Sequence, residues 1–250
     1  MEVKRRAFQG VLNILSFNRH FYILGLGVLV VLAISGLILD WPLIVMWLLF
    51  TFFLYGLIMP LIVSAYVYDF SGYYDFHWID PFIEDKDQIK RIVNVNAGFD
   101  ETSFIIHDLL PDAALSVFDF YNPIRHTEPA IKRARKVTMI YPNTKQIASN
   151  AIPLDSATVD MVFLLSAVHE IRSHEEKVLF LKECYRICRP GSQVIMVEHL
   201  RDIPNFLAFT IGFTHFFSRT IWKAAFEQAG FVNFQETKFT LFMSIFRVIR

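Results

Sequence analysis

Two long runs without a charged side chain, residues 21–39 and 43–68, constrain the fold of this 250-residue chain more than any other feature. Each run is rich in Leu, Ile, Val and Phe, and each is long enough to cross a bilayer, which takes roughly 20 apolar residues in a helix. The turn between them, residues 40–42, is too short to hold a domain and too polar for hydrocarbon. The two runs therefore predict a hairpin of two transmembrane helices, at about residues 21–39 and 43–67.

Basic residues lie on one side of this predicted hairpin. The first run is preceded by Lys4, Arg5, Arg6 and Arg19, whereas the turn contains no Lys or Arg. Because positively charged flanks stay in the cytosol, we expect residues 1–20 to form a basic cytosolic N-terminus and the rest of the chain to follow in the cytosol. The chain is then an integral membrane protein with the lipid bilayer as a partner. Its folded domain faces the cytosol, at the inner membrane if the source is bacterial.

A cleaved signal peptide followed by a buried core helix is the alternative for this segment, and the basic start favours it. The second long apolar run is difficult to place in a compact soluble core, which favours the hairpin. We therefore treat residues 21–68 as two transmembrane helices and the remainder as a separate domain.

Charge and cysteine content exclude several classes of protein. The first 68 residues hold four basic and two acidic side chains, which leaves 20 basic and 22 acidic for the remainder. Such a balance lacks the basic footprint that nucleic acid requires, so we expect no nucleic-acid partner. Cys184 and Cys188 are spaced i, i+4 on a predicted helix, which fits neither a disulfide framework nor a CxxC metal or redox site. The oligomeric state is left open by the sequence.

Short apolar runs alternate with longer amphipathic stretches through residues 89–250, after a segment at 69–88 whose Asp and aromatic residues predict a surface linker. The predicted strands are residues 92–95, 115–120, 159–165 and 192–197, and the predicted helices are residues 102–109, 127–135 and 174–188. This alternation predicts an α/β fold with a parallel, doubly wound, Rossmann-like sheet. A helix at 219–228, followed by apolar runs at 232–237 and 239–248, predicts a closing hairpin with an antiparallel last strand.

One strand-to-helix turn is a candidate ligand site. In open α/β sheets, ligands bind at the carboxyl ends of the strands, where the first turn needs a glycine so that the backbone can approach the ligand. Residues 94–100 form such a turn around Gly98, although an ordinary turn glycine is the plainer interpretation. Asp119 ends the next predicted strand, 21 residues after Gly98. An acidic side chain at that distance is suited to hold ribose hydroxyls.

At this turn and in later segments, the chain resembles the class I S-adenosylmethionine (SAM)-dependent methyltransferases, especially the ubiquinone and menaquinone methyltransferase branch. Gly98 matches the central glycine of the family's first motif, whereas the acid and the outer glycines are replaced by Asn94, Asn96 and Asp100. Further similar segments follow in the family's order, at residues 151–162, 167–171, 181–191 and 227–231. The resemblance implies a methyltransferase-like domain over residues 89–250, with SAM as its cofactor.

The resemblance also implies site residues. The expected cofactor contacts are Asn94, Asn96, Ala97, Gly98, Asp119, Phe120, Asn150, Ala151 and Ser166. The expected catalytic residues, at the acceptor side, are His169, Glu170 and His199. His169 is a candidate base because histidine can take a proton near neutral pH, although a polar residue capping a strand end is the alternative. No metal ligand set is expected.

Residues 203–217 form an apolar segment with five phenylalanines after the fifth predicted strand. This density suits a membrane-contacting lid or the wall of a lipophilic pocket, and a core helix is the alternative. With the anchor, it indicates a lipophilic small-molecule acceptor such as a lipid, a quinone precursor or a polyene-like pigment. Because side chains at the replaced glycines can block the backbone, a catalytically inactive SAM sensor or partner-binding scaffold is the competing hypothesis.

Overall fold

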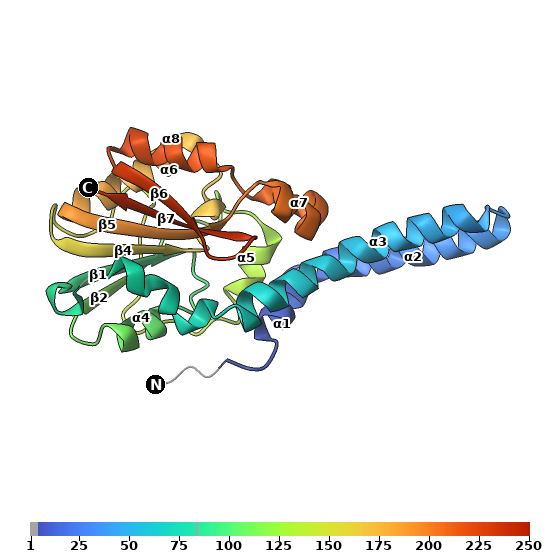
Figure 1. The fold of residues 1–250 in the computed structure, drawn as a ribbon, viewed down its shortest axis with the longest axis horizontal. Coiled ribbons are helices and arrows are strands. Elements are labelled where there is room, and N and C mark those ends of the chain that lie inside the picture. The colour runs from blue at the N-terminus through green and yellow to red at the C-terminus, as the bar shows by residue number, and fades with distance from the viewer. Residues whose placement is uncertain (1–4, 84) are drawn as a thin grey trace.

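The computed structural model describes residues 5–83 and 85–250, and it combines a projecting helical hairpin with an α/β domain (Figure 1). The hairpin consists of α2 (Arg19–Ile38) and α3 (Leu43–Ser64), which contact each other along their length. Both are long and apolar enough to cross a membrane, and only 6% and 0% of their most apolar stretches are buried. The predicted helical hairpin is thus present, and neither helix is a core helix of the domain.

The N-terminal segment is more ordered than the sequence indicates. Residues preceding the hairpin form α1 (Gln9–Phe17), whose Phe17 joins the domain core. Arg5 forms an ion pair with Glu101 at 2.6 Å, so this segment is fastened to the domain instead of being a free basic tail. Lys4, which was counted among the basic flanks, and Glu84, in the predicted linker, lie outside the described residues.

The domain is built on a seven-stranded sheet of order β3-β2-β1-β4-β5-β7-β6. Its strands are β1 (Arg91–Asn96), β2 (Ala114–Asp119), β3 (Lys145–Gln146), β4 (Val159–Leu165), β5 (Cys188–His199), β6 (Val232–Lys238) and β7 (Met243–Ile249). All neighbouring pairs from β3 to β5 are parallel, and β7 is antiparallel to both β5 and β6. The predicted doubly wound sheet with an antiparallel last strand is confirmed.

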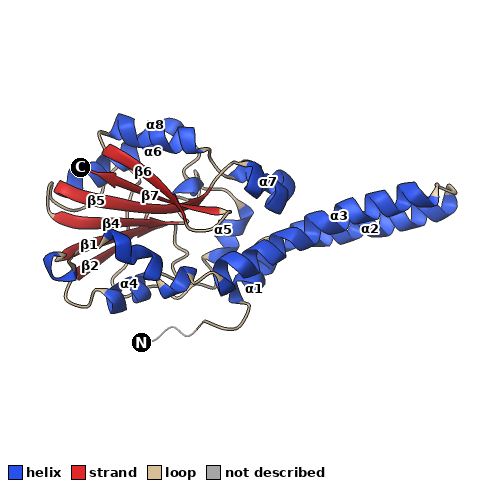
Figure 2. Cartoon of the chain, in the orientation of Figure 1, coloured by secondary structure: helices blue, strands red, loops and turns tan. Residues whose placement is uncertain are grey.

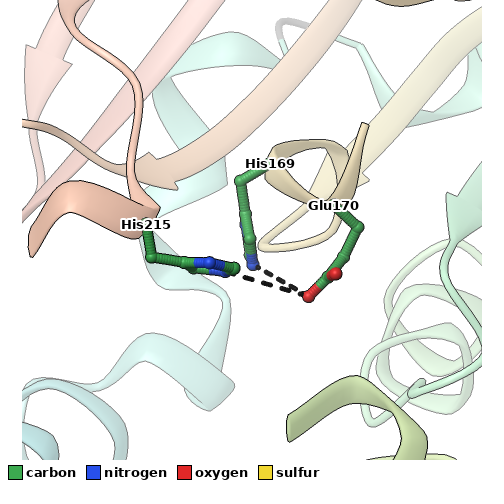
Figure 3. A group of neighbouring side chains, drawn as sticks. All are labelled: His169, Glu170 and His215. Carbon is green, nitrogen blue, oxygen red and sulfur yellow. Dashed lines mark ion pairs between the residues drawn. The ribbon is translucent and has the colours of Figure 1, made fainter. Parts of the chain in front are cut away.

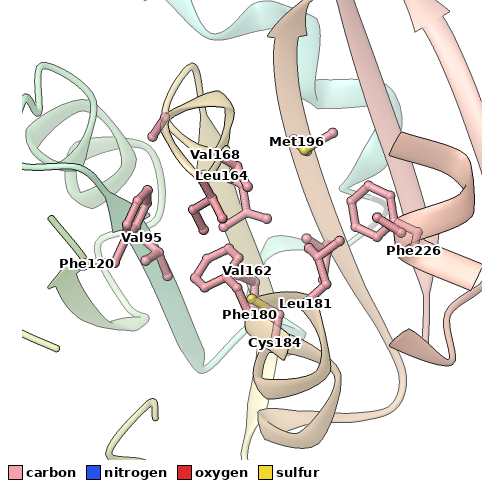
Figure 4. Close-up of a cluster of buried hydrophobic side chains, with 14 of the residues drawn as sticks. Val95, Phe120, Val162, Leu164, Val168, Phe180, Leu181, Cys184, Met196 and Phe226 are labelled. Atoms are coloured by element: carbon pink, nitrogen blue, oxygen red, sulfur yellow. The ribbon is translucent and has the colours of Figure 1, made fainter. Parts of the chain in front are cut away.

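Helices cover both faces of this sheet (Figure 2). They are α4 (Ser103–Leu109), α5 (Pro129–Ala134), α6 (His174–Ile187), α7 (Ile203–Phe209) and α8 (Arg219–Ala229). Successive strand residues point to opposite faces, so Val162 and Leu164 of β4 enter one apolar cluster while Met161 and Phe163 enter the other. The first cluster lies under α6 and α8 (Figure 4). Because helices bury both faces of the sheet, the side chains on both sides of the central strands are mostly apolar, and the strand sequences are continuous apolar runs.

The prediction of a surface linker at residues 69–88 is wrong. A π-helix (Ala65–Phe70) extends α3, and short 3-10 turns follow it. Phe76 and Ile79 are 1% and 0% exposed and pack in the second apolar cluster, which removes their apolar area from water, while the neighbouring Asp75 and Asp80 stay exposed. The last strand also begins later than predicted, at Met243, because residues 239–242 form the turn from β6.

Candidate active site

The predicted site residues gather at the carboxyl ends of β1, β2, β4 and β5. In the strand order, β1 lies between β2 and β4, which places the reversal of chain direction beside the Gly98 turn. Ligands bind at such a switch point in open α/β sheets. Most of the predicted cofactor residues lie in or directly after β1 and β2, whereas Asn150 and Ala151 come after β3 and Ser166 comes directly after β4. Of the candidate catalytic residues, His169 and Glu170 come after β4, and His199 is the last residue of β5.

Asn94, Asn96 and Asp100, which replace the acid and the outer glycines of the family's motif, stabilise the Gly98 turn by hydrogen bonds within it and to the start of α4. Gly98 has a φ of +81°, which favours glycine, and its N–H donates to Asn96 Oδ1 at 2.7 Å. Asp100 Oδ1 accepts from the N–H groups of Thr102 and Ser103, both at 2.9 Å, at the start of α4. Asn94 is buried and its amide donates to Ser103 Oγ at 2.8 Å. The substituted turn is therefore well defined.

The guanidinium of Arg135 lies over this turn. Arg135 Nη1 donates to Asp119 Oδ2 at 2.6 Å and to Ala97 O at 2.8 Å. A Cβ built on Gly98 would lie 1.4 Å from that nitrogen, so the arginine occupies the space that the missing side chain leaves. The guanidinium also stacks on the Tyr121 ring, 4.1 Å from its centroid. No sequence pattern marks this arginine as a site residue, because it comes from the loop end of a separate helix.

The surrounding residues fit an adenosine-type cofactor once that side chain moves. The Asn96 side-chain nitrogen is buried without a hydrogen-bond partner among the described residues, which leaves a donor available at the turn. A cavity of about 320 Å³ next to Asp119 is lined by Phe120, Tyr121, Ile147, Asn150 and Glu176, among others. Ala151 is bridged to Ala148 just beyond this lining. The obstacle is the far end of a flexible side chain and not backbone.

The candidate catalytic residue His169 lies in the 3-10 turn Val168–Glu170 that follows β4. Its Nδ1 donates to Glu198 Oε2 at 2.6 Å, and Glu198 at the end of β5 is 1% exposed. Burial acts to lower the pKa of His169, but the charge and hydrogen bond of Glu198 and the charge of Glu170 outweigh it and raise that pKa. Glu198 thereby fixes the ring and leaves Nε2 facing the site.

Glu170 and His215 complete a cluster with His169 (Figure 3). Glu170 Oε1 lies 3.6 Å from His169 Nε2 and 3.9 Å from His215 Nε2. His215 comes from a 3-10 helix (Thr210–His215), 46 residues after His169. It was not among the predicted site residues, and its only sequence signal was its position in the apolar segment 203–217.

His199 lies apart from this cluster, with both ring nitrogens engaged. Nδ1 donates to the Phe242 carbonyl at 2.9 Å, which leaves Nε2 to accept from Tyr68 Oη at 2.8 Å. Burial lowers the pKa of His199 to about 4, so the ring is neutral at pH 7. In this arrangement His199 joins β5 to the extension of α3.

Ser166 follows β4 with a φ of +50°. Its N–H donates to Val197 O at 2.8 Å, and its Oγ lies 3.4 Å from Tyr73 Oη. These contacts join Ser166 to β5 and to the segment that follows α3. Phe120 follows β2, where its ring is 1% exposed and forms part of the first apolar cluster.

Comparison with known proteins identifies a methyltransferase signature. Residues 124–196 match the methyltransferase domain family, and the comparison with curated proteins gives no match. A candidate O-methyltransferase from Nostoc punctiforme aligns with a TM-score of 0.51 and 12% identity, over 78% of this chain and 60% of that one. Because the identity is low, this similarity shows the fold alone.

Two further structures resemble the chain at slightly lower TM-scores. A SAM-dependent methyltransferase from Aquifex aeolicus has a TM-score of 0.49 and 15% identity, over 64% of this chain and 81% of that one. Human N-acetylserotonin methyltransferase in complex with SAM has a TM-score of 0.49 and 16% identity, over 78% of this chain and 55% of that one. The family match at residues 124–196 supports a methyltransferase domain, and the shared fold agrees with it.

Proposed function

We propose that this protein is a membrane-anchored, SAM-dependent methyltransferase that methylates a lipophilic acceptor at the cytosolic face of a bilayer. The observation that carries the proposal is the position of residues 203–217, here called the lid. Its outer side presents apolar residues beside the hairpin, and its inner side brings His215 and Phe216 against His169. One short segment thus links the anchor to the candidate acceptor site.

The lid is attached to the hairpin near its base (Figure 1). Tyr55 of α3 donates its hydroxyl to the Leu207 carbonyl at 2.6 Å, and α7 packs along α3. The exposed apolar side chains of the lid are Ile203, Phe206, Leu207 and Ile211. A contiguous apolar surface of this kind, beside two helices of membrane-spanning length, supports contact with lipid.

The cofactor side supports methyl transfer through residues that hold the nucleoside. In this proposal Asp119 accepts hydrogen bonds from ribose hydroxyls, and the cavity lined by Phe120 and Asn150 receives the base. SAM, when bound, supplies an activated methyl group on a sulfonium, so the protein's task is to align the acceptor and exclude water. Few catalytic side chains are needed for that task.

On the acceptor side, His169 is the group best placed to take a proton from an acceptor hydroxyl. Glu198 holds its Nδ1, which leaves Nε2 toward the site. The aromatic ring of Phe216 stacks on His199 at 4.9 Å and also contacts His169 edge-on at 6.5 Å. The acceptor would therefore meet an apolar wall and one basic nitrogen, which suits an amphipathic ring or headgroup on a lipophilic tail.

Titration of the detergent-solubilised full chain with SAM and S-adenosylhomocysteine tests the cofactor. We expect micromolar binding that weakens by about tenfold or more, at least about 1.4 kcal/mol, in Asp119→Ala. Asp112→Ala, which changes an exposed carboxylate away from the site, is the matched control and should bind normally. Absence of binding to the unaltered protein would overturn the cofactor assignment.

Reconstitution into vesicles that contain a membrane lipid extract tests the acceptor. SAM with a labelled methyl group should transfer label to an organic-soluble product. Cofactor binding without transfer to any lipid or quinone precursor would instead support a SAM sensor or scaffold. Transfer only to water-soluble acceptors would contradict the lipophilic acceptor.

A further inference from the structure

We propose that His169, Glu170 and His215 bind a divalent transition-metal cation such as Zn²⁺ between them. Their ligand atoms all lie within 4.8 Å of one another, and Glu170 Oε1 is 3.6 and 3.9 Å from the two Nε2 atoms. Tetrahedral Zn²⁺ with bonds of about 2.1 Å separates its ligand atoms by about 3.4 Å. Small side-chain rotations therefore bring the three groups to bonding distance (Figure 3).

The far nitrogen of each imidazole faces a carboxylate. Glu198 Oε2 is 2.6 Å from His169 Nδ1, and Glu128 Oε1 is 3.8 Å from His215 Nδ1. Histidines that bind metals usually donate their other N–H to such a carboxylate, which fixes the tautomer and makes the ligand nitrogen more basic. His169 has this hydrogen bond, and His215, from a segment far apart in the sequence, has Glu128 within ion-pair distance of the corresponding nitrogen.

The carboxylate of Glu170, whose Oε1 lies near the two imidazoles, also has an oxygen without a hydrogen-bond partner among the described residues. The residue is 5% exposed, and this oxygen, Oε2, is buried. A buried carboxylate oxygen without a partner is costly, whereas a bound cation would compensate its charge. Three carboxylates lie near the two imidazoles, from Glu128, Glu170 and Glu198. Their negative charges outnumber the positive charge of the nearby Arg172, so the local charge favours a divalent cation.

The loops that carry the ligands are tied to one another and to α6. Arg172 donates to the carbonyls of both His169, at 3.2 Å, and His215. Lys177 of α6 is fully buried and donates to Ile171 O at 2.8 Å, immediately after the turn that holds Glu170. A ligand set held by such contacts is preorganised, which lowers the cost of binding the cation.

Two imidazoles and one carboxylate favour Zn²⁺ or Fe²⁺ over Mg²⁺ or Ca²⁺, which prefer oxygen ligands. Three protein ligands leave positions open for an oxygen of a second molecule. This step rests on the proposed methyltransferase function. An acceptor with a hydroxyl group would place that oxygen at an open coordination position, where the cation would activate it. Nε2 of His169 would then bind the cation instead of taking a proton, and the cation would lower the pKa of the bound hydroxyl so that its proton leaves to water. The oxygen would take the methyl group of SAM, and S-adenosylhomocysteine would be the leaving group.

The test is metal binding by the full chain in detergent, without an affinity tag. We expect one equivalent of Zn²⁺ per chain after dialysis, measured by elemental analysis. Co²⁺ should bind the same site and give visible absorption bands typical of a nitrogen and oxygen site of low coordination number. Zn²⁺ should displace Co²⁺ and remove those bands.

Variants assign the ligands. His215→Gln and Glu170→Gln should each weaken Zn²⁺ binding by about 100-fold or more, and Glu198→Gln by about 10- to 100-fold. His107→Ala removes an exposed histidine that also lies beside a carboxylate, Asp108, and it should leave stoichiometry and affinity unchanged. S-Adenosylhomocysteine titration of each variant shows that the domain is still folded if binding is retained.

The outcomes separate this proposal from the proposed function. Absence of saturable Zn²⁺ and Co²⁺ binding, or binding that His215→Gln does not weaken, overturns the metal site. Methyl transfer that continues in the presence of a chelator would leave the enzyme assignment intact and contradict the role of the cation. Stoichiometric Zn²⁺ binding without methyl transfer would support the metal site and contradict the proposed function.

Discussion

Arg135 and Asp119 form an ion pair that closes the cofactor side of the site, with Nη1 2.6 Å from Oδ2. Asp119 is the residue best placed to hold a ribose, and the same guanidinium covers Gly98. Binding of the cofactor must therefore exchange this contact for contacts with the nucleoside. The free energy needed to break the Arg135–Asp119 ion pair therefore lowers the affinity for the cofactor.

Replacement of Arg135 measures this competition directly. We expect Arg135→Ala to bind S-adenosylhomocysteine about tenfold more tightly, a gain of about 1.4 kcal/mol, because Oδ2 of Asp119 is then free to accept from the ribose while Oδ1 still accepts from the Tyr121 N–H. Calorimetric titration is the measurement, with Lys132→Ala, an exposed cation on the same helix, as the control. Weaker binding by Arg135→Ala would show that the arginine contacts the cofactor instead of competing with it.

Glu101 should couple the N-terminal segment to the Gly98 turn. Its carboxylate accepts from Arg5 at 2.6 Å, from Gln9 at 2.9 Å and from Tyr74 at 2.6 Å. Loss of these charge-assisted hydrogen bonds in Glu101→Ala should destabilise the domain by about 1–3 kcal/mol. Denaturant unfolding in detergent gives this value, and hydrogen exchange should become faster in α1. Glu101→Gln keeps a hydrogen-bond acceptor, so its free energy of unfolding should fall by less than that of Glu101→Ala. An equal fall in both variants would show that the charge of Glu101 alone stabilises the domain.

His199 should make the domain sensitive to acid. Its pKa falls from 6.5 to about 4 on folding because the ring is buried, so the unfolded chain binds more protons between these values. Stability is then fully present above about pH 6.5 and decreases by up to about 3 kcal/mol as the pH falls toward 4. Unfolding free energies across this range should show a flatter profile for His199→Gln. His107→Gln, at an exposed site, should keep the profile of the unaltered protein.

We expect the exposed side of the lid to contact lipid when a membrane-bound acceptor is methylated. Ile211 is 78% exposed on the lid, and a charge there would oppose contact with hydrocarbon. We expect Ile211→Glu to reduce methyl transfer to a vesicle-bound acceptor by about tenfold while cofactor affinity is unchanged. Val232→Glu is the control, since Val232 is 55% exposed at the opposite end of the sheet. Equal losses in the two variants would argue against a membrane-facing lid.

Local patterns in the sequence determined the helical hairpin, the alternation of strands and helices, and the Gly98–Asp119 pairing of turn and strand end. The lengths of the two charge-free runs determine α2 and α3, and the apolar runs determine β1, β2, β4 and β5. Each of these features depends on residues close together in the chain, so period and spacing are sufficient to predict it.

Only the tertiary structure decided which side chains meet. Three features depend on how the loops fold back over the sheet. They are the contact of Arg135 with Asp119, the burial of Phe76, and the approach of His215 to His169 over 46 residues. Such contacts are set by desolvation and by the positions of distant backbone segments, which spacing along the chain does not encode. The sequence therefore determined the scaffold and the Gly98 turn, whereas the tertiary structure determined the cluster around His169, because the residues of that cluster come from separate loops.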